Sequence, residues 1–311
     1  MIQNHEQKND KNFQITDILL GKGGSGCVYK GINLLDKTQV AVKIIKKQSI
    51  NQQRYDNEIS ILKSCHHENI IKLFVTWEDG EQLYIVTELA EGGELFDHII
   101  ERDHYSEKDA AAIAKQILSA LFYLHQHNIS HGDIKPQNIL LSKVPEGYCF
   151  QQQKFIPLVK VSDFGMARID NSVKCQGGSP GFVAPEILQN LDGYSTQPDI
   201  YSFGVLVYCM IAGELLFDGD SSIEMIRKQI YEEYEFNDIF KLTSKQCHEF
   251  VKKCIKKDFK DRPSAEELLN DPWFDIQLDI NIENKQKLKK FQTTKLQAAI
   301  GLLLFGQVVE Q

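Results

Sequence analysis

Four polar side chains in the middle of the chain have the types and spacing that phosphoryl transfer requires. Such a transfer needs a carboxylate to orient the attacking hydroxyl, a cation for the moving phosphoryl group and oxygen ligands for magnesium. Asp133, Lys135 and Asn138 supply all three from one loop. Asp163 adds a second hard oxygen ligand for the metal. The alternative is a polar loop capped by Asp133.

A run of glycines at residues 21–26 could hold phosphates through its backbone. It lies where one strand is expected to turn back into a second, whereas the dinucleotide-binding fingerprint needs a strand, a turn and a helix. Gly21, Gly23 and Gly26 would let backbone amides close over phosphates without interference from side chains. A flexible hairpin tip is the alternative. The neighbouring Cys27 is interpreted as an inert small residue rather than a reactive thiol.

The expected strand over residues 38–45 carries a lysine on a face where the other side chains are small or apolar. Alternation places Ala41 and Lys43 on one face and the valines on the other. This arrangement suits a cleft in which Ala41 covers a base and Lys43 meets its phosphates. A buried lysine needs a partner, and Glu58 on the following helix is a candidate. The alternative is a surface lysine on an edge strand.

The elements that must position these residues change in kind along the chain. From about residue 13 to 89 the pattern favours strands, with a turn at residues 79–80. Apolar Ile59 and Leu62 recur at helical spacing, so one helix is expected over residues 51–65.

After residue 93 long helices are expected. Ser106 with Asp109, and Ser264 with Glu267, have the spacing of capping boxes that begin two of them. The sequence therefore predicts an α+β fold with a small sheet-rich lobe, a larger helical lobe and a ligand cleft between them. The first of these two helices has a buried stripe of Ile113, Ile117, Leu121 and Leu124.

Composition limits the classes of protein to which the chain can belong. The 311 residues are 42% hydrophobic and 25% charged, which is enough apolar material for a core. The formal net charge of -8 argues against nucleic acid as a partner. Seven cysteines without a Cys-x-x-Cys pair indicate free thiols in a reducing compartment.

The two ends of the sequence bear on targeting to a membrane or to the secretory route. The polar start does not resemble a signal peptide, and Ile2 stands where myristoylation needs glycine. The apolar stretch at residues 296–309 is interrupted and too short to span a bilayer. We expect a soluble cytoplasmic protein with no transmembrane segment, in which residues 1–12 are disordered.

Five motifs in one order make the chain resemble eukaryotic-type protein kinases. The resemblance covers about residues 13–274 and implies the bilobal protein kinase fold, with an N-lobe at 13–88, a C-lobe at 93–274, and ATP and Mg²⁺ as cofactors. The motifs are the glycine run, Val40-Ala41-Val42-Lys43, residues 131–138 (His-Gly-Asp-Ile-Lys-Pro-Gln-Asn), Asp163-Phe164-Gly165 and Ala184-Pro185-Glu186.

The resemblance implies a role for each matching residue. Asp133 is the catalytic carboxylate, Lys135 stabilises the γ-phosphate, and Asn138 and Asp163 bind magnesium. Lys43 pairs with Glu58. Thr87 is the gatekeeper before a hinge of Glu88, Leu89 and Ala90. Glu186 pairs with Arg262, and Asp199 holds the backbone of the catalytic loop. The implied nucleotide-binding residues are Leu20, Gly21, Lys22, Gly23, Gly24, Ser25, Gly26, Cys27, Val28, Ala41, Lys43, Thr87, Glu88, Ala90, Glu94 and Leu140.

The resemblance also indicates a class of kinase and of substrate. Lys135, together with residues 178–180, resembles serine/threonine kinases rather than tyrosine kinases. Residues 91–96 and 181–186 are most similar to calcium/calmodulin-dependent and calcium-dependent kinases. In such enzymes the carboxylate matching Glu94 helps to read an arginine upstream of the phosphorylated residue. A preference for basic sites is therefore expected.

One motif departs from the family pattern. Gly132 stands where the family has an arginine that receives the activation-loop phosphate. We expect activity that does not depend on phosphorylation between residues 163 and 186, although Ser172 and Ser179 are available there. The alternative is a harmless substitution in a weak or pseudo-active enzyme.

Two segments lie outside the pattern. Residues 142–158 form a longer connection than is usual and are expected to be an extended hairpin loop. The tail at 275–311 runs from lysines into an apolar stretch, which resembles an autoinhibitory junction, and 285–305 could bind a calmodulin-like partner. No calcium-binding loop pattern occurs, so calcium sensing would need that partner. A packed or frayed terminal helix and a membrane-surface helix are the alternatives.

The sequence thus predicts an ATP-dependent serine/threonine protein kinase that acts on protein hydroxyls. The main rival is a pseudokinase that uses the fold as a binding scaffold. The joint presence of Lys43, Glu58, Asp133, Asn138 and Asp163 argues against it. A kinase for small molecules or lipids is a weaker rival.

Overall fold

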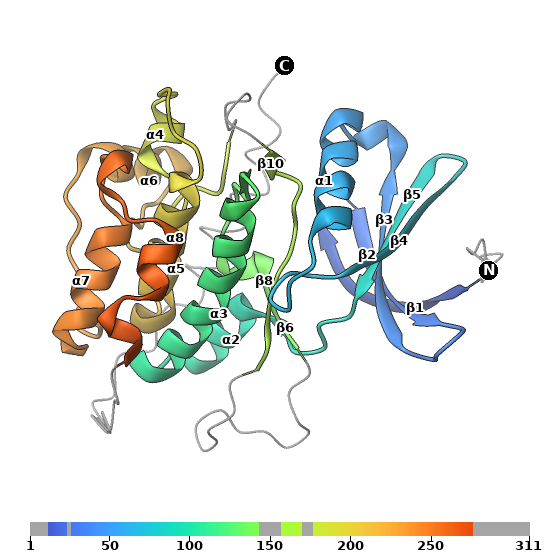
Figure 1. Cartoon of the computed structure of the whole chain (residues 1–311), viewed down its shortest axis with the longest axis horizontal. Coiled ribbons are helices and arrows are strands. Elements are labelled where there is room, and N and C mark those ends of the chain that lie inside the picture. Colours follow the sequence, from blue (N-terminus) through green and yellow to red (C-terminus); the bar gives the residue numbers. More distant parts are fainter. Residues whose placement is uncertain (1–11, 24–25, 143–156, 170–176, 276–311) are drawn as a thin grey trace.

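A five-stranded antiparallel sheet and a mainly helical lobe lie side by side in the computed structural model (Figure 1). The structure describes residues 12–23, 26–142, 157–169 and 177–275. The predicted α+β bilobal class is confirmed. The sheet has the strand order β1-β2-β3-β5-β4. Its strands are β1 (Phe13–Gly23), β2 (Gly26–Asn33), β3 (Gln39–Lys46), β4 (Leu73–Asp79) and β5 (Gln82–Glu88).

Strand β3 separates two small cores, as its alternation predicts. Val40 and Val42 are fully buried in a cluster that also contains Phe13 and Tyr84. On the other face, Ile45 packs with Ile59 of helix α1 (Gln52–Ser64). The face that carries Ala41 and Lys43 is therefore the one that α1 covers (Figure 1).

The starts of the helices follow local capping chemistry. The Asn51 side chain accepts a hydrogen bond from Arg54 N–H and begins α1, in agreement with the predicted helix. Ser264 and Glu267 form the predicted reciprocal box at α8 (Ala265–Leu269). At α3 (Glu107–Gln126) the described structure contains only the serine half, in which Ser106 accepts from Asp109 N–H. Asp109 is one methylene shorter than a glutamate, so its carboxylate has less reach back to the cap.

Helix α5 (Gln197–Ala212) forms the centre of the helical lobe, and almost its whole length is buried. The predicted stripe on α3 is also completely buried. The remaining helical elements are α2 (Leu95–Arg102), α4 (Pro185–Leu188), α6 (Ser222–Tyr231), α7 (Lys245–Cys254), and the 3-10 turns η1 (Lys47–Ser49), η2 (Pro136–Asn138), η3 (Phe240–Leu242), η4 (Phe259–Asp261) and η5 (Pro272–Asp275).

Two small sheets between the lobes carry the predicted catalytic segments. Residues 131–138 connect the strand of one small sheet to a strand of the other, and residues 162–167 do the same in the opposite direction. The pairing of these strands therefore brings two segments together that are far apart in sequence. The sheets contain β7 (Ile129–Ser130) with β10 (Arg168–Ile169), and β6 (Gly93–Glu94) with β8 (Ile139–Leu141) and β9 (Val159–Val161).

Several sequence-based predictions fall on residues outside the described ranges. These are Gly24, Ser25, Ser172, the N-terminal residues before Asn12, the tip of the 142–158 connection and the tail beyond Asp275. Among the residues that the structure describes, no helix is long and apolar enough to cross a membrane.

Candidate active site

The backbone of the loop at residues 131–138 is held by a carboxylate of α5. Asp199 accepts hydrogen bonds from His131 N–H at 2.9 Å and Gly132 N–H at 2.8 Å. His125 Nε2 lies 3.0 Å from the same side chain. Burial alone would raise the pKa of Asp199, but the bonds and charges of these groups hold it below its usual value. Asp199 thus makes the backbone contacts that were predicted for it.

Asp133 lies at the centre of a compact group of hydrogen bonds. Its Oδ2 is 2.7 Å from Lys135 Nζ and accepts a bond from Asn138 Nδ2 at 3.0 Å. Its Oδ1 accepts from the Ser179 hydroxyl at 2.8 Å, and that hydroxyl accepts from Lys135 Nζ at 2.8 Å. Two of the other predicted site residues, Lys135 and Asn138, therefore bind the carboxylate of Asp133.

Ser179 is a member of this group that the sequence pointed to only indirectly. In the sequence, the triplet at residues 178–180 indicates the kinase class, and Ser179 is one of the serines available for phosphorylation. In the structure it is buried, with only 7% of its surface exposed, and its hydroxyl bridges Asp133 and Lys135. This geometry gives Ser179 a place in the candidate active site.

Asn138 and Asp163 have the oxygen donors that magnesium prefers. Asn138 Nδ2 donates hydrogen bonds to both the backbone carbonyl and the side chain of Asp133. The amide oxygen of Asn138 can therefore act as a ligand for a cation. Asp163 adopts φ +60, and its side chain is 48% exposed. Magnesium is commonly bound by one or two such ligands, with waters and substrate phosphates completing its shell. The residues therefore fit this ion.

Lys43 connects the two lobes electrostatically. Its Nζ lies 3.6 Å from Glu58 Oε1 on α1 and 3.9 Å from Asp163 Oδ1. Burial alone would lower the pKa of Lys43, but the charges of Asp163 and Glu58 raise it above its usual value. Burial raises the pKa of Glu58, whereas Lys43 and Lys135 hold the pKa of Asp163 below its usual value. The predicted pairing of Lys43 with Glu58 is present.

The predicted nucleotide-binding residues of the sheet lie in adjacent cross-strand rows. Val28 is paired with Lys43, and Ala41 with Thr87. Cross-strand partners share a face of the sheet, so these four side chains line one surface. The register also places Gly23 opposite Gly26, which confirms that the glycine run joins two strands. Gly26 has φ +144, a backbone conformation that side chains disfavour.

Other predicted nucleotide-site residues have more specific positions. The Glu88 carboxylate accepts from Lys72 N–H at 2.8 Å and lies 2.8 Å from Lys160 Nζ. The Glu88 carboxylate is thus engaged by Lys72 and Lys160, and Glu88 N–H donates to the carbonyl of Lys72 at 2.9 Å. Leu140 of β8 is paired with Glu94 of β6 in the three-stranded small sheet. Burial and the charge of Asp97 raise the pKa of Glu94 to about 7, against the opposing effect of Lys135.

The predicted pair of Glu186 and Arg262 is fully buried. Arg262 Nη2 donates to Glu186 Oε2 at 2.7 Å, and the exposed fraction of both side chains is zero. Arg262 Nε also donates to the carbonyl of Lys256 at 2.8 Å. This bidentate pair ties the end of the segment carrying Ser179 to the C-terminal part of the domain.

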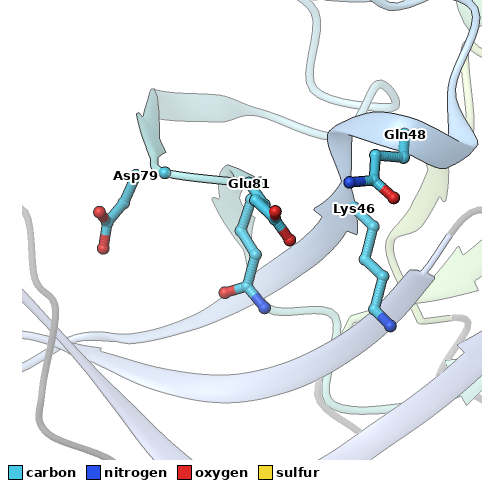
Figure 2. A pocket seen from close by; sticks show the side chains of 6 residues that line it. Lys46, Gln48, Asp79 and Glu81 are labelled. Carbon is cyan, nitrogen blue, oxygen red and sulfur yellow. The ribbon is translucent and has the colours of Figure 1, made fainter.

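A surface hollow of about 470 Å³ lies at the turn between β4 and β5, away from these residues. Figure 2 shows Asp79 and Lys46 on opposite sides of this hollow. None of the predicted site residues lines it. The hollow is bounded by Lys46, Gln48, Asp79, Gly80, Glu81 and Gln82.

Known proteins are similar to this chain over the region that contains these residues. A family model described as protein kinase domain matches residues 15–274. Calcium-dependent protein kinase 3 of Plasmodium berghei is 38% identical over 303 residues, covering 90% of this chain and 52% of that protein. Myosin light chain kinase A of Dictyostelium discoideum is 37% identical over 279 residues, covering 88% of this chain and 91% of that protein. The chain spans about half the length of the Plasmodium relative.

Proposed function

The chain belongs to the protein kinase family, and from this premise we propose that it transfers the γ-phosphate of ATP to serine or threonine hydroxyls of proteins. The observation that carries the proposal is the hydrogen-bonded group of Asp133, Lys135 and Ser179. Two relatives whose names are those of protein kinases support the choice of protein substrates. A pseudokinase is the second candidate, and the experiment below separates the two.

The reaction assigns a task to each side chain. Asp133 Oδ1 already accepts a bond from a hydroxyl, that of Ser179, so it can orient an incoming substrate hydroxyl and receive its proton. As the hydroxyl oxygen bonds to the γ-phosphorus, the bond to the β-phosphate oxygen breaks and ADP leaves. Lys135 offsets charge on the phosphoryl group. Mg²⁺ held by Asn138 and Asp163 would supply further charge neutralisation on the phosphates.

The direct test is transfer of labelled phosphate from ATP to a serine peptide with basic flanking residues, using the full chain. Transfer that requires magnesium and is lost in Asp133→Asn would support the proposal. Absence of transfer to peptides and to a protein substrate panel, together with intact ATP binding, would favour the pseudokinase. Transfer to metabolites but not to peptides would favour a small-molecule kinase.

We also propose that Glu94 reads an upstream arginine in the substrate, and this selection should depend on pH. Its pKa is raised to about 7, so its charged fraction grows as the pH rises through neutrality. Only the charged form makes a charge-assisted bond with arginine. The ratio of kcat/KM for an arginine peptide over its alanine counterpart is expected to rise about five- to tenfold between about pH 6 and 8. In Glu94→Gln this ratio should be low and should not change with pH. A ratio equal to that of the unaltered chain at both pH values would contradict the assignment.

Activity is further proposed to be independent of phosphorylation in the loop between residues 163 and 186. Gly132 offers no side chain to receive a phosphate, has φ +79, and a Cβ there would lie 2.8 Å from the carbonyl oxygen of Met166. Treatment with a phosphatase is expected to leave kcat/KM within about twofold of its initial value. A large loss of activity, with the removed phosphate mapped to this loop, would contradict the proposal.

Two further proposals concern regulation and location. The segment at residues 285–305 lies outside the described ranges, and its basic-apolar pattern supports binding to a calmodulin-like partner. The name of the Plasmodium relative agrees with regulation by calcium. Failure of a 285–305 peptide to bind calcium-loaded calmodulin would count against this.

A cytoplasmic location is proposed because the five cysteines in the described part of the chain are free thiols, and fractionation of cells would test it.

A further inference from the structure

The segment at residues 179–184, called here the acceptor segment, has a direct link to the catalytic carboxylate. Its first residue, Ser179, donates to Asp133 and accepts from Lys135. Any displacement of the acceptor segment therefore alters the bonds on the group that orients the substrate hydroxyl. What holds this segment in place bears on the reaction.

The acceptor segment is a tight turn with few internal bonds. Its internal hydrogen bonds converge on one atom, because the carbonyl oxygen of Ser179 accepts from both Phe182 N–H and Val183 N–H at 2.9 Å. Gly181 has φ +87, and Pro180 has no N–H to donate. The other polar backbone groups at residues 181–183 need partners from elsewhere in the fold.

One glutamine on α6 supplies two of those partners. Gln229 Oε1 accepts from Gly181 N–H at 2.9 Å, and Gln229 Nε2 donates to the carbonyl of Val183 at 2.9 Å. Ser202 of α5 supplies a third bond, from its hydroxyl to the carbonyl of Phe182 at 2.9 Å. The side chain of Gln229 thus spans the turn and uses both halves of its amide on it.

The burial of Gln229 shows that this contact is specific. Gln229 is completely buried and follows the buried Met225 by one helical turn, so it stands on the inward stripe of α6. An apolar side chain at such a position would avoid the cost of burying an amide. The buried amide is tolerated because its oxygen and its nitrogen both have hydrogen-bond partners. If the two atoms exchanged places, the NH₂ group would meet Gly181 N–H and the oxygen would meet the carbonyl of Val183, so both bonds would be lost. The arrangement therefore recognises one backbone conformation of the acceptor segment.

We propose that Gln229 is a positioning residue for the phosphate acceptor, one that acts through the acceptor segment and Ser179 rather than by touching the substrate. The inference rests on the proposed kinase function and assigns α6 a part in it. Loss of the Gln229 bonds should loosen the turn and weaken use of the peptide substrate. Nucleotide binding should be spared, since Gln229 bonds to neither the Lys43 group nor the magnesium ligands.

The test compares Gln229→Met with Asn237→Leu in the full chain. Asn237 is the control because its side chain also bonds to backbone groups, accepting from Phe240 N–H at 2.8 Å and donating to the carbonyl of Ala212 at 3.1 Å, outside the acceptor segment. Gln229→Met should lower kcat/KM for a serine peptide about thirtyfold, the effect of two lost neutral hydrogen bonds, mainly through the peptide KM. The KM for ATP should stay within about twofold. Asn237→Leu should lower thermal stability with little change in either KM.

Amide hydrogen exchange supplies a readout that is independent of activity. The Gly181 amide should exchange faster in Gln229→Met than in the unaltered chain, whereas Asn237→Leu should leave its rate unchanged. If Gln229→Met does not fold, Gln229→Asn is the substitute, because its amide is one methylene too short to span the turn.

The outcomes separate this inference from the function on which it rests. Peptide transfer by the unaltered chain, with equal kcat/KM and equal Gly181 exchange in the Gln229 variant, would overturn the positioning role alone. Equal losses of peptide use in Gln229→Met and Asn237→Leu would also overturn it, by showing a general effect on stability. No peptide transfer by the unaltered chain would overturn the proposed function and this inference with it.

Discussion

Asp133→Asn is expected to lower kcat for peptide phosphorylation about 10³-fold while ATP still binds. Both oxygens of Asp133 accept hydrogen bonds, from Ser179 on one side and from Lys135 and Asn138 on the other. An asparagine replaces one of these acceptors with an NH₂ donor and removes the negative charge. It can then neither receive the substrate proton nor hold Lys135 by an ion pair.

The measurement is steady-state transfer to the basic serine peptide, together with calorimetric titration of ATP and magnesium. The Kd for ATP should change by no more than about threefold, because Lys43, Glu58 and Asp163 form a separate group of contacts. Asp238→Asn is the control, since this carboxylate is 98% exposed and its pair with Lys241 spans 3.7 Å. Transfer that survives in Asp133→Asn but not in Asp163→Asn would contradict the role given to Asp133.

Arg262→Met is expected to reduce the free energy of unfolding by about 3–5 kcal/mol. The substitution leaves the Glu186 carboxylate buried without its bidentate partner. An uncompensated buried charge costs far more than the lost attraction of a surface pair. In a domain of this size such a loss corresponds to a fall in Tm of about 10 °C.

Thermal and urea unfolding of matched variants would check this value. Arg227→Met is the control, because Arg227 pairs with Glu232 at 2.6 Å but is 58% exposed, and it should cost less than about 1 kcal/mol. The double variant Glu186→Gln with Arg262→Met should recover part of the loss, since no charge is then left buried. A loss in Arg262→Met as small as that in the surface control would show that the pair contributes little.

Features that depend on neighbours in sequence could be predicted from the chain itself. The start of α1 at Asn51 follows from a capping side chain and apolar spacing, both of which act within one helical turn. The alternation in β3 determined which face carries Lys43, and the glycine run determined where β1 turns into β2. These are short-range effects of sterics and hydrogen bonding, so a local pattern is enough to predict them.

The order of the motifs determined more than local structure. It indicated the family, and with it the approach of Lys43 to Glu58 and of Glu186 to Arg262, pairs that spacing alone does not bring together. The same resemblance led to the expectation that Asp199 holds the catalytic loop. The spacing of Ser106 and Asp109 predicts a full capping box. The prediction of the bond from the Asp109 carboxylate back to Ser106 N–H is wrong, because the side chain of aspartate is shorter than that of glutamate.

Only the tertiary structure decided how separate segments share hydrogen bonds. Ser179 meets Asp133 across 46 positions of sequence, and Gln229 meets Gly181 across 48. In sequence, Gln229 is one polar residue in a short amphipathic helix, with no pattern that distinguishes it. Its hydrogen-bond partners include the backbone groups of Gly181 and Val183, and nearly every residue has such groups, so the side chain alone cannot indicate which of them it will meet. That choice is made by the packing of α6 and of the two small sheets, which brings particular N–H and C=O groups within reach.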